Sequence, residues 1–221
     1  MDSNEPPGAC TDFDIAFADM RVFIYLLLLL SIRVADAWAE DSILVLGDSL
    51  SAGYGISKEK AWPALLQQRL NQQGYSLRVI NASISGDTTH GGLNRLPKAL
   101  ERERPAVVII ELGANDGLRG LRLQNIADNL NRMTALSQES GAKVLLLGIQ
   151  LPQNFGSAYR NRFNAIYARV AEERRAALVP FFLEGVAETR AMMQPDGLHP
   201  SAAAQPAILE NIWRALLPLL N

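Results

Sequence analysis

The run VVII at residues 107–110 decides the fold, because four consecutive apolar residues leave the segment no polar face to turn toward water. A second such run, VLLL at 144–147, follows after a stretch with helical periodicity. Strands that are apolar along their whole length are typical of parallel sheets, in which helices cover both faces. We therefore expect a parallel sheet enclosed between two layers of helices.

Further apolar stretches extend this pattern to both sides. Strands are expected over 43–46, 77–81, 106–112, 143–149 and 177–181. Amphipathic stretches predict helices over 61–73, 92–103, 123–140, 158–175 and 202–219. Pro97 lies inside one of them, which should kink or restart there. Strands that alternate with helices, without repeats or a Pro/Ser-rich linker, indicate one three-layer α/β domain.

The first 39 residues differ from the rest of the chain. An acidic segment precedes Met20, and an apolar run at 22–32 then leads to the small-residue sequence ADAWA at 35–39. A basic residue, a short apolar run and an A-x-A site predict a secretory signal. We expect cleavage after Ala39, with Met20 as an alternative translation start, and a domain over 40–221. An uncleaved membrane anchor is disfavoured because the apolar run is shorter than about 17 residues.

Composition excludes several functions. The chain carries 21 basic and 23 acidic residues, and its mature part would carry a formal charge of +2, without a basic cluster. Nucleic acid is therefore not expected as a partner. The one cysteine, Cys10, lies in the predicted leader, and no metal-ligand spacing is present. Neither a disulfide nor a metal site is expected.

Polar residues follow several of the expected strands. Ser49 comes after the first strand, Gly86 after the second and Asn115 after the third, whereas Asp196 and His199 come after the last. Ligand sites in open parallel sheets form at the carboxyl ends of the strands. We expect these residues to meet at one edge of the sheet.

Ser49 is a candidate nucleophile if a base removes its proton. Only His90 and His199 could act as that base, and each has an aspartate three positions upstream, Asp87 and Asp196. His199 is favoured because a tight turn across glycine can bring Asp196 to its Nδ1 atom. The alternative is that His199 only caps the last helix. The backbone N–H groups of residues 49 and 86 and the side-chain amide of Asn115 are candidate oxyanion donors, although each also suits an ordinary turn.

Four short sequence blocks occur along the chain in the same order as in a known family. They are GDSLS at 47–51, SGDT at 85–88, GANDG at 113–117 and DGLHP at 196–200. Together they resemble the SGNH, or GDSL, hydrolases. Further stretches are similar to the bacterial periplasmic thioesterase I, arylesterase and lysophospholipase branch of that family, and these are AGYG at 52–55, AWPALL at 61–66, NASISGDT at 81–88, ELGANDGLRG at 111–120 and VPFFLEGV at 179–186. The resemblance covers residues 41–221.

The resemblance implies a flavodoxin-like sheet of five parallel strands. It also implies Ser49 as nucleophile, His199 as base, Asp196 as the residue that orients the base, and Ser49, Gly86 and Asn115 as oxyanion donors, with no cofactor. The sequence departs from a G-x-S-x-G elbow, since Ser51 stands at the second glycine position. The nucleophile is therefore expected on a loop or a first helical turn.

The implied substrates are small acyl compounds: fatty-acyl thioesters, lysophospholipids and aryl esters. We hypothesise an acyl groove formed by Leu118, Leu121, Leu151 and Phe155, which lie in the loops after the third and fourth strands. Lipid substrates would bring a monomeric enzyme, periplasmic or secreted, into transient contact with a membrane surface.

Two alternatives remain at this point. A carbohydrate O-acetyl esterase would use the same catalytic groups with a smaller acyl pocket, and a catalytically silent module would bind lipid or glycan on the same scaffold. Asp48 and Asp116 beside the blocks are interpreted as structural hydrogen-bonding residues. Arg119 could meet a substrate phosphate, but a solvated loop arginine is commoner.

Overall fold

The computed structural model describes residues 42–220 of the chain. The predicted leader over 1–39, its cleavage point and the alternative start at Met20 lie outside the described residues. Within those residues no helix is both long enough and apolar enough to span a bilayer.

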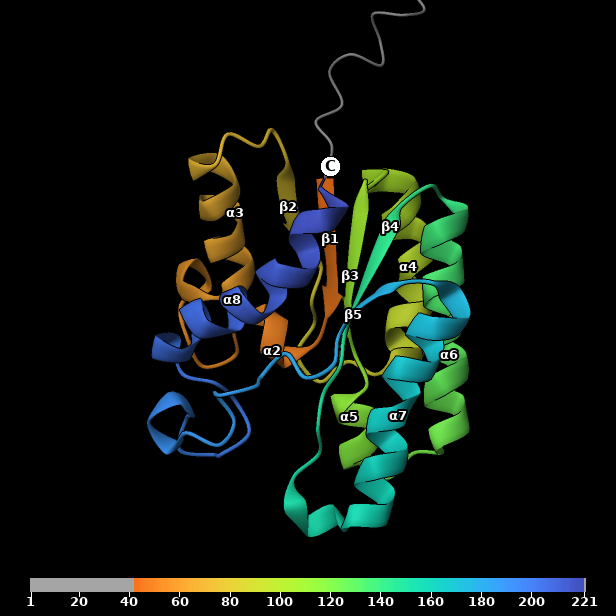
Figure 1. The fold of residues 1–221 in the computed structure, drawn as a ribbon, viewed down its shortest axis with the longest axis vertical. Coiled ribbons are helices and arrows are strands. Elements are labelled where there is room, and N and C mark those ends of the chain that lie inside the picture. Colours follow the sequence, from red (N-terminus) through yellow and green to blue (C-terminus); the bar gives the residue numbers. More distant parts are fainter. Residues whose placement is uncertain (1–41, 221) are drawn as a thin grey trace, which may run out of the picture. The chain divides into compact units, whose positions relative to one another are not determined.

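The centre of the domain is one parallel sheet in the order β2-β1-β3-β4-β5 (Figure 1). Its strands are β1 (Ser42–Gly47), β2 (Arg78–Asn81), β3 (Val107–Glu111), β4 (Lys143–Leu147) and β5 (Ala177–Val179). The predicted five-stranded parallel sheet is thus confirmed. Because the chain returns to the same end of the sheet through a helix after each strand, the carboxyl ends of all five strands share one edge.

Helices cover both faces of the sheet, as the apolar runs require. The α-helices are α2 (Ser49–Ala52), α3 (Trp62–Gln72), α4 (Thr89–Glu103), α5 (Ala114–Leu118), α6 (Leu123–Glu139), α7 (Ser157–Arg174) and α8 (Gln205–Leu216). Helices α3 and α8 pack together on one side of the sheet, and α4, α6 and α7 pack in a row on the other (Figure 1). Short 3₁₀ helices occupy Lys58–Lys60, Gln153–Phe155, Arg190–Met192, Ala202–Ala204 and Leu217–Leu219.

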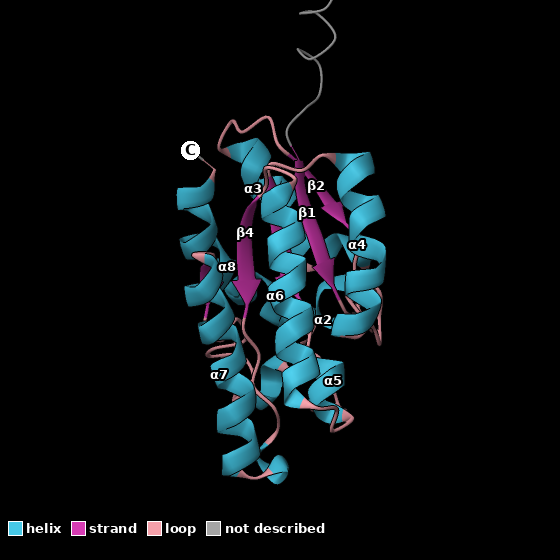
Figure 2. Cartoon of the chain, turned by 90° about the vertical axis from the view of Figure 1, so that its right-hand side faces the viewer, coloured by secondary structure: helices cyan, strands magenta, loops and turns pink. Residues whose placement is uncertain are grey.

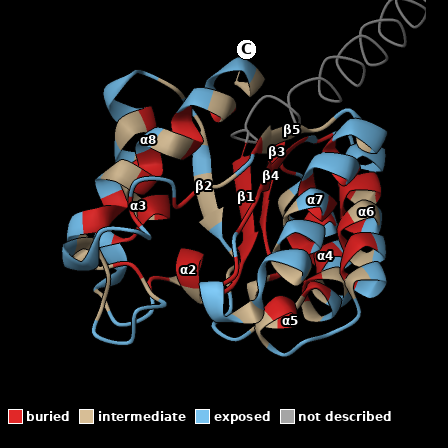
Figure 3. Cartoon of the chain, turned by 60° about the horizontal axis from the view of Figure 1, so that its bottom comes forward, coloured by how far each residue is buried: buried red, intermediate tan, exposed pale blue. Residues whose placement is uncertain are grey.

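The core lies where these helices meet the sheet, and Figure 3 shows its central strands buried. Every residue of β1 and β3 is buried, which explains why neither strand alternates between apolar and polar side chains. Helix α6 buries Ile126, Leu130 and Met133 completely, at the three- and four-residue spacing of the sequence pattern. Burying each such side chain contributes about 1.5–3 kcal/mol to folding.

Helix α4 departs from the prediction. It begins at Thr89, three residues before the expected start, because the Thr88 side chain caps it by accepting the backbone N–H of Gly91 at 3.2 Å. It also continues through Pro97 without restarting. Pro97 lies on the exposed side of the helix, where water can satisfy the carbonyl that loses its partner.

Two short helices were not predicted as separate elements. Figure 2 shows α2 and α5 near the ends to which the strand arrows point. Each is about one turn long and follows directly on a buried strand, β1 for α2 and β3 for α5. A single turn is too short to give a periodic pattern. Both carry residues of the candidate site.

Candidate active site

The serine of the first block begins helix α2. Gly47 ends β1, the Asp48 side chain accepts the backbone N–H of Leu50 at 3.0 Å as N-cap, and Ser49 is the first helical residue. A Cβ atom at position 47 would lie 2.8 Å from Ser51 Cβ, so only glycine fits there. The nucleophile candidate therefore sits on a first helical turn, as its sequence context predicts.

Ser49 forms a continuous hydrogen-bonded chain with His199, 150 positions away, and with Asp196. His199 Nε2 lies 2.9 Å from Ser49 Oγ, and His199 Nδ1 lies 2.7 Å from Asp196 Oδ2. The Ser49 hydroxyl can donate to Nε2 only if Nδ1 carries the ring proton, which the Asp196 carboxylate accepts. This tautomer presents an unprotonated nitrogen to the serine, as a general base requires.

The backbone turn over residues 196–199 keeps Asp196 ionised. The backbone N–H groups of His199 and Leu198 donate to its Oδ1 atom at 3.0 and 2.9 Å. These bonds, with the one to the imidazole, lower the pKa of Asp196 to about 2, with the backbone N–H of His199 as the largest cause. Because the Asp196 side chain is 39% exposed, solvent screens its charge, and its chief effect is to orient the ring.

The rival histidine does not reach the serine. His90 is exposed, and its Nε2 atom lies 3.0 Å from Asn94 Nδ2 on the same helix. Asp87, three positions before His90, accepts instead from Arg95 Nε at 2.8 Å. Arg95 Nη2 also donates to the carbonyl of Gly47 at 3.2 Å, so this ion pair anchors the loop after β2 to the end of β1.

The loop that carries His199 is held by contacts that sequence reasoning missed. The Tyr54 ring lies 4.5 Å from the imidazole of His199, centroid to centroid, at a tilt of 38°. Gln194 links the two segments, because its Nε2 atom donates to the carbonyls of Tyr54 at 2.7 Å and Pro200 at 3.0 Å. A tyrosine next to glycines gives no sequence signal for such a contact.

The two other oxyanion candidates lie on neighbouring segments. Asn115 is on α5, where its Nδ2 atom donates to Asp48 Oδ2 at 3.0 Å. Gly86 lies on the loop after β2 with φ +80°, a conformation that favours glycine. Arg119 Nη2 donates to the carbonyl of Gly86 at 3.0 Å, so this arginine joins the loop to the end of α5.

A buried pair of carboxyl groups lies beneath the serine. Glu111 Oε2 accepts from the backbone N–H of Asp48 at 3.2 Å and from Ser51 Oγ at 2.7 Å. Trp62 Nε1 donates in turn to Ser51 Oγ at 3.2 Å. The side chains of Asp48 and Glu111 are also hydrogen-bonded to each other, and both residues are buried.

Burial sets the protonation of this pair. It raises the pKa of Asp48 to about 6 and raises the pKa of Glu111 well above its usual range, with the charge of Asp48 as the second cause for Glu111. At neutral pH Glu111 therefore holds the proton and donates to an ionised Asp48. Glu111 was expected only as part of a strand. Its one signal in the sequence is a charged residue that ends an apolar run.

Asp116, the other aspartate beside a block, has a structural position. It is buried, and its carboxylate accepts from the backbone N–H of Thr89 at 2.8 Å and from Thr89 Oγ1 at 2.6 Å. It therefore ties α5 to the first turn of α4. Among residues 42–220, no group of three or more His, Cys, Asp or Glu side chains is arranged to hold a metal ion.

An open cleft of about 610 Å³ adjoins the triad and is lined by Ser49, Asn115 and His199. Of the four residues hypothesised for an acyl groove, Leu118 and Leu151 line it. Leu121 does not, because the chain turns outward at Gly120 and leaves it 41% exposed. Phe155 also lies outside the lining and stacks against Tyr159 at 6.3 Å between ring centroids.

Other apolar residues take the places of these two. The cleft is also lined by Leu50, Ile149, Phe181, Leu183, Met193 and Leu198. Phe181 and Leu183 follow β5, which brings the end of that strand into the site. The cleft thus has apolar side chains beside Ser49, and its polar lining includes Gln150, Gln153, Arg160 and Glu188.

Comparisons with known proteins agree with this geometry. Residues 45–206 match the model of the GDSL-like Lipase/Acylhydrolase family. The chain is 55% identical to esterase TesA of Pseudomonas aeruginosa, over 82% of this chain and 90% of that protein. It is 45% identical to thioesterase 1/protease 1/lysophospholipase L1 of Escherichia coli K12, over 95% of this chain and 98% of that protein.

A solved structure is similar over the same region. The psychrotrophic esterase EstA of a Pseudoalteromonas species, crystallised with monoethylphosphonate as inhibitor, is 40% identical with a TM-score of 0.78. The match covers 82% of this chain and 99% of that one. Sequence and fold therefore point to the same group of proteins.

Proposed function

The chain belongs to the GDSL-like lipase/acylhydrolase family, and on this premise we propose that Ser49, His199 and Asp196 are its catalytic triad. The protein is a hydrolase of carboxylic esters and thioesters that acts on small-molecule substrates. The observation that carries the assignment of residues is the distance of 2.9 Å between His199 Nε2 and Ser49 Oγ, with Asp196 2.7 Å behind the imidazole.

The first half of the reaction forms an acyl-enzyme. Ser49 Oγ attacks the carbonyl carbon of the substrate while its proton passes to His199 Nε2. When the tetrahedral intermediate collapses, the bond to the leaving oxygen or sulfur breaks, and His199 gives the proton to that atom. Asp196 stabilises the imidazolium between the two transfers without taking its proton.

The second half returns the enzyme to its starting state. A water molecule loses one proton to His199 Nε2 and attacks the acyl-enzyme carbonyl. The second intermediate then releases the carboxylic acid as His199 returns the proton to Ser49 Oγ. Both halves use the same base, so one hydrogen-bonded chain serves the whole cycle.

Negative charge forms on the carbonyl oxygen in both intermediates. We assign the backbone N–H groups of Ser49 and Gly86 and the Asn115 amide to bind it. Asn115 Nδ2 has two hydrogens, and only one is needed for the bond to Asp48. The other remains available for the oxyanion.

The apolar cleft supports acyl chains longer than acetyl. A volume of about 610 Å³, lined by Leu118, Leu151, Phe181 and other apolar residues, exceeds what a two-carbon acyl group fills. Each methylene buried there adds about 0.8 kcal/mol, or roughly a fourfold gain in binding. This favours fatty-acyl esters and thioesters over the acetyl groups of carbohydrates.

Two measurements test the proposal. A fluorophosphonate probe should label the wild-type protein and leave Ser49→Ala unlabelled, whereas equal labelling of both would show that another residue is the nucleophile. On p-nitrophenyl esters from acetyl to dodecanoyl, kcat/KM should rise with chain length and then reach a plateau. A maximum at acetyl would instead support the carbohydrate O-acetyl esterase.

We also propose that the protein is exported and acts as a monomer. The sequence of residues 20–39 supports export, and the proposed catalytic groups all come from one chain. Lipid substrates would require transient contact with a membrane surface. Amino-terminal sequencing of the mature protein should begin at Glu40, and light scattering should give the mass of one chain.

A further inference from the structure

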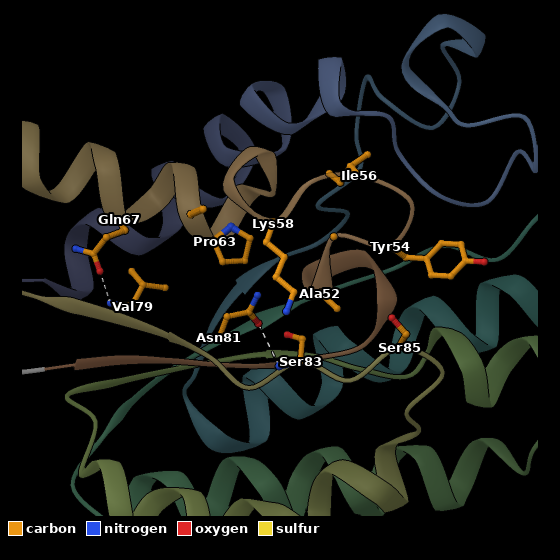
Figure 4. A pocket seen from close by; sticks show the side chains of 12 residues that line it. Ala52, Tyr54, Ile56, Lys58, Pro63, Gln67, Val79, Asn81, Ser83 and Ser85 are labelled. Carbon is orange, nitrogen blue, oxygen red and sulfur yellow. Dashed lines mark hydrogen bonds between the residues drawn. The ribbon is translucent and has the colours of Figure 1, made fainter.

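A second pocket, of about 560 Å³, lies between α3, β2 and the loop that follows α2 (Figure 4). None of its lining residues belongs to the proposed triad, and its only charged lining residue is Lys58. Figure 4 shows the Lys58 side chain extending from its 3₁₀ helix across the pocket toward Asn81 and Ser83. Lys58 forms no ion pair within residues 42–220.

One end of this pocket adjoins the catalytic residues. Tyr54 lines the pocket, and its ring lies 4.5 Å from the imidazole of His199. Ser85 lines it as well and directly precedes Gly86. Figure 4 shows Tyr54 and Ser85 together at one end, with Gln67 and Val79 at the other. The pocket therefore extends from Tyr54, beside His199, to Gln67 and Val79.

The walls of the pocket are fixed by hydrogen bonds. Asn81 Nδ2 donates to the carbonyl of Ser51 at 2.8 Å, while its Oδ1 atom accepts the backbone N–H of Ser83 at 3.1 Å. Gln67 Oε1 accepts the backbone N–H of Val79 at 2.7 Å. The Ser83 hydroxyl, by contrast, is shielded from solvent and has no partner among the described residues, which is uncommon for a buried polar atom.

The two pockets differ in the chemistry that they offer. The cleft lined by Ser49 has mainly apolar side chains beside the serine and suits the acyl chain, although Arg160 and Glu188 also line it, whereas the only charged group that lines the second pocket is the Lys58 ammonium. In the first half of the reaction His199 gives its proton to the leaving atom, so the leaving group must lie beside His199. The second pocket, which has Tyr54 at one end, is therefore in position to hold the part of the leaving group beyond its leaving atom.

We propose that this second pocket binds the leaving group and that Lys58 selects leaving groups that carry a phosphate. The inference rests on the function proposed above, because it presumes attack by Ser49 and protonation by His199. A phosphate ester on the leaving group would pair with the Lys58 ammonium. Two sources share this chemistry: the headgroup of a lysophospholipid and the phosphopantetheine arm of an acyl-thioester.

The test compares matched substrates that differ only in the phosphate. One arm uses 1-octanoyl-glycerol 3-phosphate against 1-octanoyl-glycerol, and the other uses octanoyl-phosphopantetheine against octanoyl-pantetheine. In each arm the ratio of kcat/KM for the charged over the neutral substrate measures the preference. It is determined for the wild-type protein, Lys58→Met, Lys58→Glu and Lys60→Met. Lys60 belongs to the same 3₁₀ helix but does not line the pocket, so it is the matched control.

We expect Lys58→Met to lower the kcat/KM ratio of the charged over the neutral substrate about fivefold in at least one arm, because the variant loses one partly screened charge pair. Lys58→Glu should lower it further, and Lys60→Met should leave it unchanged. The arm that responds identifies the source of the phosphate. Raising the salt concentration to about 0.5 M should bring the wild-type ratio toward that of Lys58→Met.

Three results would overturn the inference. The first is a kcat/KM ratio that is unchanged in the Lys58 variants in both arms, and the second is an equal effect of the Lys58 and Lys60 variants. The third is that none of the four substrates is hydrolysed although p-nitrophenyl octanoate is cleaved. Failure of the proposed function would look different, because p-nitrophenyl octanoate would then be cleaved equally well by Ser49→Ala.

Discussion

Asn115 Nδ2 donates to Asp48 Oδ2 at 3.0 Å and so joins the helix that carries the proposed oxyanion amide to the cap of the helix that carries the serine. The other carboxylate oxygen of Asp48 accepts the backbone N–H of Leu50 at 3.0 Å. One buried carboxylate thus holds both the nucleophile and an oxyanion donor. Glu111 holds that carboxylate from below.

Replacement of Asn115 by alanine should slow the chemical step. The variant loses a donor to the oxyanion, and we expect kcat to fall about 10²–10³-fold with little change in KM. Steady-state kinetics on p-nitrophenyl octanoate measures the effect. Asn94→Ala is the matched control, because Asn94 is exposed and its side-chain amide pairs with the exposed His90. Equal losses in the two variants would argue against an oxyanion role for Asn115.

Glu111 should be replaceable by glutamine but not by leucine. In the Glu111→Gln variant the side-chain amide can donate to Asp48 and accept from Ser51, as the protonated carboxyl does. We expect this variant to keep kcat within about threefold of the wild-type value. Glu111→Leu leaves the backbone N–H of Asp48 and the Ser51 hydroxyl without their acceptor, at a cost of about 1–3 kcal/mol each.

The readouts for these variants are activity and urea unfolding. Glu111→Leu should lower the free energy of unfolding by about 3 kcal/mol, as the loss of those two hydrogen bonds implies, and reduce kcat in the fraction that remains folded. Rescue by glutamine is informative because the neutral glutamine side chain can replace a protonated glutamate, which donates one hydrogen bond, but cannot replace an ionised one. Should Glu111→Gln be as impaired as Glu111→Leu, Glu111 would not be the holder of the proton.

The same buried pair predicts how stability changes with pH. Both pKa values are raised in the folded protein, so the folded protein keeps protons that the unfolded chain releases above its ordinary carboxyl pKa values of 3.8 and 4.5. The free energy of unfolding therefore falls as the pH rises above these values. The fall continues to about pH 6 for Asp48 and to higher pH for Glu111, and each proton contributes up to about 1.4 kcal/mol per pH unit.

Urea unfolding of the wild-type protein and Glu111→Gln at pH 5 and pH 8 checks this expectation. The wild-type protein should lose more stability between the two pH values than the variant, which has one titrating carboxyl fewer. Asp196 does not interfere, because its lowered pKa of about 2 affects stability only below about pH 4. Parallel changes in the two proteins would contradict the protonation assigned to Glu111.

The sheet was predictable because its strands are apolar throughout. Runs such as 107–110 and 144–147 can be placed only between two layers of helices, and β3 and β4 lie there. The rule that sites form at the carboxyl ends of parallel strands also predicts that the polar residues gather at one edge. The bond between Ser49 and His199, across 150 positions, follows from that topology.

Other parts of the site depend on register and side-chain packing. Glu111 lies beneath the serine because β1 and β3 pair with Gly47 opposite Glu111, and the residues alone do not specify this offset. Leu121 and Phe155 are apolar and near the site in sequence, yet one turns to solvent and the other stacks on Tyr159. Apolar character predicts burial somewhere, but only the path of the loop decides which cavity a side chain lines.

The last prediction separates the two histidine–aspartate pairs. His199→Ala should lose activity about as completely as Ser49→Ala, because neither proton transfer can then occur, whereas His90→Ala should retain most of it. In Asp196→Asn the side-chain oxygen can still accept the backbone N–H groups of the turn, but the amide NH2 then faces His199 Nδ1 and donates to it, which puts the ring proton on Nε2 and removes the base from the serine. We therefore expect a loss in kcat that is smaller than that of His199→Ala, on the order of 10²–10⁴-fold. Steady-state kinetics on p-nitrophenyl octanoate measures all four variants, and circular dichroism checks that each is folded. Loss of activity in His90→Ala with retention in His199→Ala would move the base to α4 and end the assignment of the triad.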